Sequence, residues 1–178
     1  EKRWRTLQAK MDAEDLDVVI AHGHEADPAN VRYLSNYWPL FETGGVAMGR
    51  SGDPILLIGP ESHTFAEGRS TIEDIMLILE YRESAEPEYP GADLDTFGDV
   101  FGELADGNPK RIGIAGMSIL PVTIYEAIRE AAGDAEASTP TSGGAASRSD
   151  SVRIAGTRKT TPGLRGVEKR AVVAGGGD

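Results

Sequence analysis

The sequence lacks cysteine altogether, which excludes disulfide bonds, thiolate metal sites and cysteine nucleophiles among its 178 residues. It also lacks any apolar run of the roughly 18 residues that a transmembrane helix needs, so we expect no membrane partner. No apolar leader stretch opens the chain, and we therefore expect a cytoplasmic protein. Only three histidines are present and none follows His63, so chemistry that needs an imidazole must lie before that residue.

Basic side chains are scarce, with 18 Lys and Arg against 29 Asp and Glu and a net charge of −11. This balance argues against a nucleic-acid partner, because phosphate binding needs clustered basic groups. The charge is also uneven, at −15 over residues 1–147 and +4 over residues 148–178. Together with the Ser-, Gly- and Arg-rich composition from Ser138 onward, it predicts a folded domain over residues 1–136 and a linker or disordered tail over residues 137–178.

Apolar residues in the first part of the chain alternate between helical spacing and short buried runs. The predicted helices cover residues 4–11, 28–34, 60–68, 94–104 and 121–132, and the predicted strands cover residues 16–21, 45–48, 55–58, 75–79 and 111–115. The turn GRSGDP between the second and third strands favours an antiparallel hairpin. Helices between buried strands indicate a three-layer α/β/α domain with a mixed sheet of about five to six strands.

Two histidines close the first predicted strand. His22 and His24 are alternate residues, so both rings point to the same face and could reach one metal ion, with His63, Glu25 or Asp27 as a further ligand. Two histidines without a fixed third ligand are more often ordinary polar residues at a strand end. A metal-binding or small-molecule module that uses His22 and His24 is therefore kept as an alternative.

Aromatic residues gather in the segment NVRYLSNYWPLFETGG, residues 30–45. Tyr33, Tyr37, Trp38 and Phe41 are four of the 11 aromatic residues of the chain and fall within nine positions. Pro39 interrupts regular structure between them. A loop of this kind buries its aromatic rings in its own core or presents them to a partner or ligand, and the sequence leaves both possibilities open.

Several motifs in order carry a family resemblance. LDVVIAH at residues 16–22 is followed by P-x-N-V-R-Y-L-S-N-Y at 28–37, G-G-V-A-M at 44–48 and ILLIG at 55–59. This succession resembles the N-terminal domain of the creatinase, prolidase and Xaa-Pro aminopeptidase family, the pita-bread hydrolases and metallopeptidases. The resemblance covers residues 1 to about 135 and implies a ribonuclease-H-like motif.

The resemblance places catalysis outside this chain. In metal-dependent members a following pita-bread domain holds two divalent metals, Mn, Co or Zn, with two Asp, one His and two Glu. We expect that domain to be absent here, so we predict no catalytic residue and no cofactor in this chain. The parent family consists of hydrolases, and we predict that this chain alone is inactive.

The resemblance also implies a role for the aromatic loop. In such proteins the N-terminal domain helps to build a dimer or larger homo-oligomer, works with the catalytic domain in cis, and brings its loop near the substrate. By position, the substrate-facing candidates are Tyr37, Trp38, Leu40, Phe41 and Glu42. Glu42 could meet a substrate amine through a charge-assisted hydrogen bond.

Overall fold

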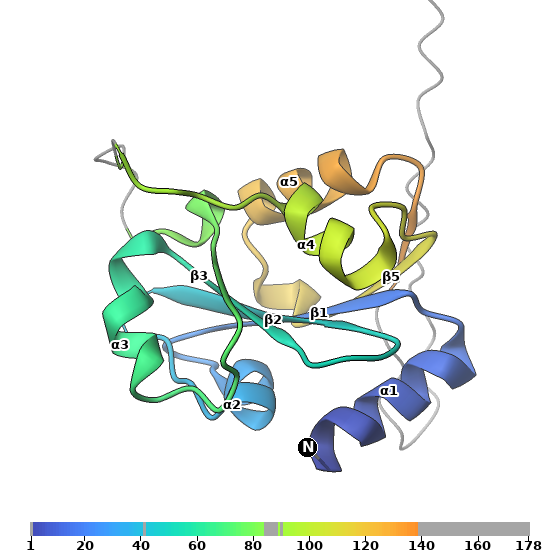
Figure 1. Ribbon diagram of the computed structural model, residues 1–178, viewed down its shortest axis with the longest axis horizontal. Helices are drawn as coiled ribbons and strands as arrows, with labels where there is room; N and C mark the ends of the chain where they lie inside the picture. The colour runs from blue at the N-terminus through green and yellow to red at the C-terminus, as the bar shows by residue number, and fades with distance from the viewer. Residues whose placement is uncertain (1, 41, 84–88, 90, 139–178) are drawn as a thin grey trace, which may run out of the picture.

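A six-stranded mixed sheet forms the centre of the computed structural model, which describes residues 2–40, 42–83, 89 and 91–138 (Figure 1). Its strand order is β4-β3-β2-β1-β5-β6. The strands are β1 (Val18–His24), β2 (Thr43–Gly49), β3 (Ile55–Ile58), β4 (Ile75–Leu77), β5 (Arg111–Ala115) and β6 (Glu136–Ser138). The first three strands form an antiparallel meander, and β5 and β6 follow parallel to β1. This confirms the predicted mixed sheet with its ribonuclease-H-like motif.

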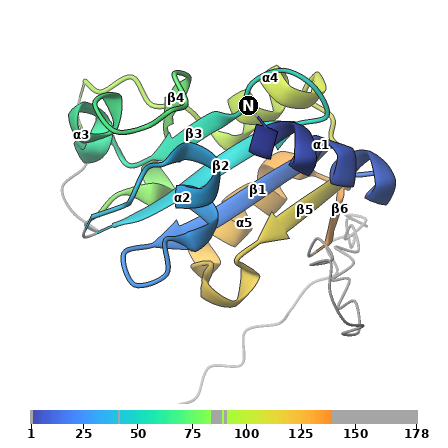
Figure 2. The same cartoon turned by 90° about the horizontal axis from the view of Figure 1, so that it is seen from below.

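Helices cover both faces of the sheet, which confirms the three-layer prediction (Figures 1 and 2). One face carries α1 (Lys2–Glu14), α2 (Ala29–Ser35) and α3 (His63–Glu67), and the other carries α4 (Phe97–Ala105) and α5 (Val122–Ala132). Three short 3-10 turns, η1 (Pro60–Ser62), η2 (Leu79–Tyr81) and η3 (Met117–Ile119), join these elements. None of the helices in the described part of the chain is both long and apolar enough to cross a membrane.

The strand β1 shows why its sequence is a continuous apolar run rather than an alternating one. Val18 and Ile20 belong to the core under α4 and α5, whereas Val19 and Ala21 pack toward α1 and α2. All four side chains are buried. A central strand with helices on both faces needs apolar residues at every position, which is the pattern that predicted it.

Several predicted boundaries differ from the structure, and local hydrogen bonds or turns explain two of the differences. The helix predicted from residue 94 begins at Phe97, because Thr96 caps it through a reciprocal pair of hydrogen bonds with Asp99. The carboxylate of Asp95 instead accepts a hydrogen bond of 2.8 Å from the backbone N–H of Leu77. The strand predicted over residues 75–79 ends at Leu77, where the chain turns into η2.

The sequence analysis missed the edge strand β6. This strand pairs in parallel with β5 and buries Ala137, but three residues with one apolar side chain give no readable pattern. The predicted domain boundary at residue 136 therefore falls inside a strand. The remainder of the predicted tail, residues 139–178, lies outside the described residues.

A cluster of charges joins the start of the sheet to the loop after β2. Arg50 contacts Asp15 at 2.6 Å and Asp17 at 3.2 Å, and the hydrogen bond from Arg50 holds the pKa of Asp15 below its usual value. The other oxygen of Asp17 accepts hydrogen bonds from the backbone N–H groups of Lys110 and Arg111. One carboxylate thus links three segments that are far apart in sequence.

Candidate functional site

The loop between α2 and β2, residues 36–42, is fixed at its start by backbone and side-chain hydrogen bonds. Asn36 ends α2 in a left-handed conformation, and its N–H donates to the carbonyl oxygen of Arg32. The hydroxyl of Ser35 donates to Val31 and accepts from the N–H of Tyr37. The loop therefore leaves the helix in a defined direction rather than as an unrestrained connection.

Two buried polar side chains, one near each end of the loop, are joined by a hydrogen bond. Tyr37 has no exposed surface, and its hydroxyl donates a 2.5 Å hydrogen bond to Oε1 of Glu42, which is 6% exposed. Burial raises the pKa of Tyr37, and Glu42 adds to that shift. Burial likewise raises the pKa of Glu42, although hydrogen bonds from Ser62 and Tyr37 oppose the shift. The pair spans the loop and ties its two ends together.

Above this pair the loop presents apolar side chains to solvent. Trp38 is 43% exposed and Leu40 is 42% exposed, whereas most other large apolar residues of the described chain are buried. The guanidinium of Arg32 lies 5.2 Å from the centre of the Trp38 ring and fixes one side of it by a cation–π contact. Tyr33 on α2 is 54% exposed, and the guanidinium of Arg3 makes a cation–π contact with its ring.

The structure separates the five residues that the sequence placed near a substrate. The side chains of Tyr37 and Glu42 are buried and bond to one another, and their role beside a substrate stays a prediction. The Tyr37 hydroxyl is paired with Oε1 of Glu42, whereas Oε2 of Glu42 is buried without a hydrogen bond of normal geometry among the described residues. Trp38 and Leu40 remain available at the surface, and Phe41 lies outside the described residues.

The three histidines have different surroundings. His22 is fully buried, and neither ring nitrogen makes a hydrogen bond of normal geometry among the described residues. Burial and the neighbouring His24 lower the pKa of His22 to about 4, although the backbone of Ile119 acts in the opposite direction. Nδ1 of His24 accepts hydrogen bonds from the N–H groups of Ala26 and Asp27 and so closes the turn after β1.

No metal centre is assembled from these histidines. His63 begins α3 and lies 3.8 Å from Glu67 on the same helix. Across residues 2–40, 42–83, 89 and 91–138, no group of three or more histidine, aspartate or glutamate side chains is placed to hold a metal ion. The ring of His22 instead packs 5.8 Å from that of Tyr81, whose hydroxyl is also buried without a partner.

A family comparison matches most of the chain. The family model described as "Creatinase/Prolidase N-terminal domain" matches residues 3–147. A second model, "Quinolinate phosphoribosyl transferase, C-terminal domain", matches residues 137–178. The sequence analysis did not find this second similarity, which lies where it predicted a linker or tail and covers less than half of the chain. No curated protein matches the chain.

Solved structures share the fold at low sequence identity. A proline dipeptidase from Streptococcus agalactiae 2603V is 13% identical with a TM-score of 0.56, over 79% of this chain and 93% of that one. The N-terminal domain of the cytoplasmic peptidase PepQ from Mycobacterium tuberculosis H37Rv is 18% identical with a TM-score of 0.52, over 73% and 84%. The prolidase from Pyrococcus horikoshii OT3 is 17% identical with a TM-score of 0.50, over 74% and 30%.

The resemblance to creatinase and prolidase N-terminal domains in the sequence motifs agrees with the structure and with the family comparison. The structure supplies the strand order and the layers, and the first family model supplies the matched residues. The matched region, residues 3–147, contains both the whole described sheet and the loop that carries Trp38. The chain belongs to the creatinase/prolidase N-terminal domain family.

Proposed function

We propose that residues 2–138 form a non-catalytic domain of a hydrolase related to prolidases and Xaa-Pro aminopeptidases. In this role the domain contributes contacts between copies and holds an apolar surface beside the substrate of a catalytic domain in cis. The similar domain of the Pyrococcus horikoshii prolidase supports such an arrangement, because this chain covers only 30% of that longer polypeptide. Divalent metals, Mn, Co or Zn, would then belong to the catalytic domain and not to this one.

One observation carries this proposal. Trp38 and Leu40 are exposed on a loop whose neighbouring residues Tyr37 and Glu42 are locked in the core by a short hydrogen bond. An exposed tryptophan on a well-fixed loop is costly in water and is the type of residue that dominates binding interfaces. A fixed apolar surface can narrow access to a substrate chamber and exclude water from it.

The proposal also assigns the domain to the cytoplasm. Its support is the likeness to the N-terminal domain of a peptidase whose name describes it as cytoplasmic, PepQ of Mycobacterium tuberculosis.

Self-association of the full 178-residue chain tests the interface role. Sedimentation equilibrium should show reversible dimers, and the Trp38→Ala/Leu40→Ala double variant should weaken the association constant about tenfold or more. Val122→Ala is the matched control, because Val122 is 65% exposed on α5 and lies outside the loop. A chain that stays monomeric, or a double variant that dimerises like the wild type, contradicts the interface role.

Hydrolysis tests the assignment as non-catalytic. The purified chain, supplied in turn with Mn²⁺, Co²⁺ and Zn²⁺, should not cleave an Xaa-Pro dipeptide above the rate of metal alone. The reason is that the described residues offer no group of three ligands that could hold a metal and activate water. Metal-dependent turnover that copurifies with the chain would overturn the assignment.

A further inference from the structure

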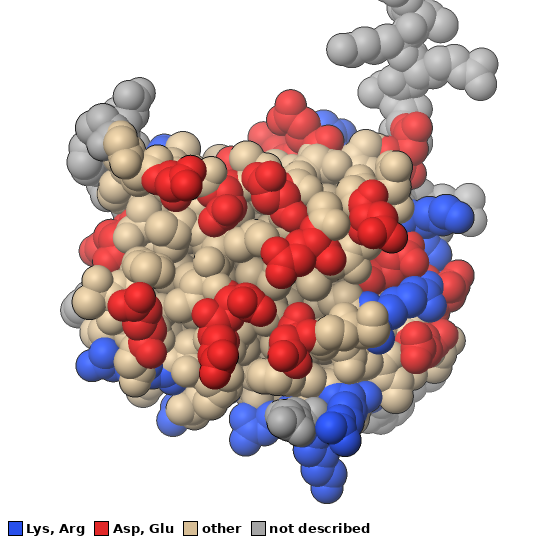
Figure 3. All heavy atoms as spheres, in the orientation of Figure 1, with Lys and Arg blue, Asp and Glu red and all other residues tan. Residues whose placement is uncertain are grey.

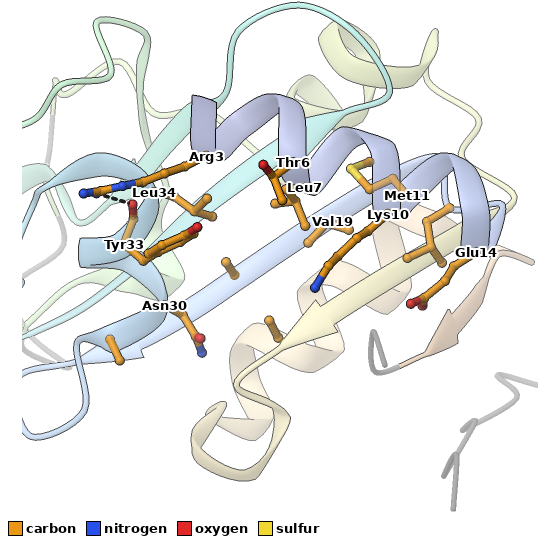
Figure 4. A pocket seen from close by; sticks show the side chains of 14 residues that line it. Arg3, Thr6, Leu7, Lys10, Met11, Glu14, Val19, Asn30, Tyr33 and Leu34 are labelled. Atoms are coloured by element: carbon orange, nitrogen blue, oxygen red, sulfur yellow. Dashed lines mark hydrogen bonds between the residues drawn. The ribbon is translucent and has the colours of Figure 1, made fainter. Parts of the chain in front are cut away.

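A groove of about 500 Å³ opens on the α1 side of the sheet, between α1 and α2 (Figure 4). Helix α1 forms one wall and α2 the other, and β1 and the end of β5 form its floor. Its volume lies within the range of small-molecule sites. The groove is therefore large enough for an organic ligand and is separate from Trp38 and Leu40.

Small side chains leave this groove open. Ala21 on β1, Ala29 on α2 and Ala115 on β5 line it, so the strands approach the surface without a large side chain above them. Leu7 and Leu34 extend the hydrophobic wall, and Met11, Leu16 and Val19 lie beneath it with at most 1% of their surface exposed. The interior of the groove thus suits the apolar body of a ligand rather than a fully polar one.

The rim is basic in an acidic protein. Figure 3 shows acidic side chains spread over the face in view, with Lys and Arg gathered toward the edge where α1 lies. Helix α1 itself contains four basic residues and two acidic ones, against a net charge of −15 for residues 1–147. Two of those basic residues, Arg3 and Lys10, line the groove together with the carboxylate of Glu14.

The two cations of the rim are held differently. The guanidinium of Arg3 donates a 2.7 Å hydrogen bond to the carbonyl oxygen of Tyr33 and lies over the Tyr33 ring, which fixes it at one end. The side chain of Lys10 extends from the middle of α1 over the strands, as Figure 4 shows. A flexible ammonium above an apolar floor is suited to meet one carboxylate whose hydrocarbon part lies beneath it.

We propose that this groove binds an amphipathic monocarboxylate, a molecule with one carboxylate and an unbranched or aromatic apolar body. Lys10 meets the carboxylate, Arg3 adds positive potential at the Tyr33 end, and the apolar body lies along Leu7 and Ala115. Charge complementarity selects an acid over an amine here, even though the whole chain attracts cations more strongly than anions.

Calorimetric titration of the full chain with decanoate, at concentrations well below micelle formation, tests the site. Decylamine is the opposite-charge probe of the same length. We expect saturable one-to-one binding of decanoate that is about tenfold tighter than any binding of decylamine. Equal or tighter binding of decylamine, or no saturable binding of decanoate, overturns the proposal.

Variants locate the binding in the groove. Lys10→Gln should weaken decanoate binding about three- to fivefold, as expected for loss of one exposed ion pair. Lys2→Gln removes the same charge from the same helix outside the groove and should leave binding unchanged. Ala29→Leu places a larger side chain into the groove from an exposed position of α2 and should abolish saturation. Unaltered binding in Lys10→Gln or in Ala29→Leu refutes the assignment to this groove.

Discussion

His22 should make the stability of this domain depend on pH. The side chain has no exposed surface, and burial, with a contribution from His24, lowers its pKa from the ordinary 6.5 to about 4. At about pH 7 the ring is neutral in both the folded and the unfolded chain, so it contributes no pH dependence there. As the pH falls below 6.5, the unfolded chain binds a proton that the folded chain does not bind until about pH 4.

The magnitude follows from these two pKa values. Each pH unit between them lowers the free energy of unfolding by about 1.4 kcal/mol, because one proton separates the two states. The contribution of His22 is therefore a loss of about 2 kcal/mol at pH 5 and about 3 kcal/mol at pH 4, which levels off at about 3.4 kcal/mol at lower pH. Against a typical stability of about 5–15 kcal/mol, this is a measurable fraction.

The substitution His22→Phe isolates this effect, because it keeps a ring beside Tyr81 and removes the titrating group. Urea unfolding of wild type and variant between about pH 7 and pH 5 gives two curves whose difference cancels the titration of groups that do not interact with His22. We expect the variant to gain about 2 kcal/mol relative to the wild type over this range.

A matched control separates titration from packing. Tyr81→Phe removes the Tyr81 hydroxyl, which is also buried without a partner among the described residues, but burial raises the pKa of this phenol, so it stays protonated throughout the range. Its pH slope should follow that of the wild type. If His22→Phe shows the wild-type slope as well, then His22 gains its proton freely inside the folded chain and the reasoning from burial is refuted.

Two further predictions concern stability away from His22. Arg50→Gln should lower the free energy of unfolding in urea by about 1 kcal/mol, because its contacts with Asp15 and Asp17 are partly exposed. The loss should shrink in about 1 M salt, where such ion pairs are screened. A loss that does not depend on salt would mean that packing and not charge is responsible. Thr96→Ala should lower stability by about 1 kcal/mol through loss of the α4 cap, whereas Thr96→Ser keeps the hydroxyl and should stay near wild type; equal losses in both variants would argue against the cap.

Much of the architecture could be read from local pattern. The run from Leu16 to Ala21 predicted a buried strand, because a strand buried on both faces must be apolar at successive positions, and the structure has β1 at Val18–His24. The glycine-rich turn before Ile55 predicted the hairpin, since turn residues act within a few positions of the chain. The order of these local signals also sufficed for the family resemblance that the family match bears out.

Local pattern was insufficient wherever a partner distant in sequence decided the outcome. The strand β6 exists because β5 supplies its hydrogen bonds, and nothing in residues 136–138 alone distinguishes it from a linker. Gly45 shows the same limit. It lies opposite His22, and a Cβ atom there would come within 2.4 Å of the Tyr81 hydroxyl, a contact between segments far apart in sequence.

The aromatic loop shows what the sequence determined and what the tertiary structure determined, because some of its side chains are buried and others are exposed. The sequence alone determined that this loop is rich in aromatic residues and adjoins β2, because composition and turn chemistry are local properties. Only the tertiary structure decided that Tyr37 and Glu42 face inward while Trp38 and Leu40 face outward. A side chain's direction in an irregular loop has no period to predict it, and it is set by the hydrogen-bond partner and the packing that it finds across the fold.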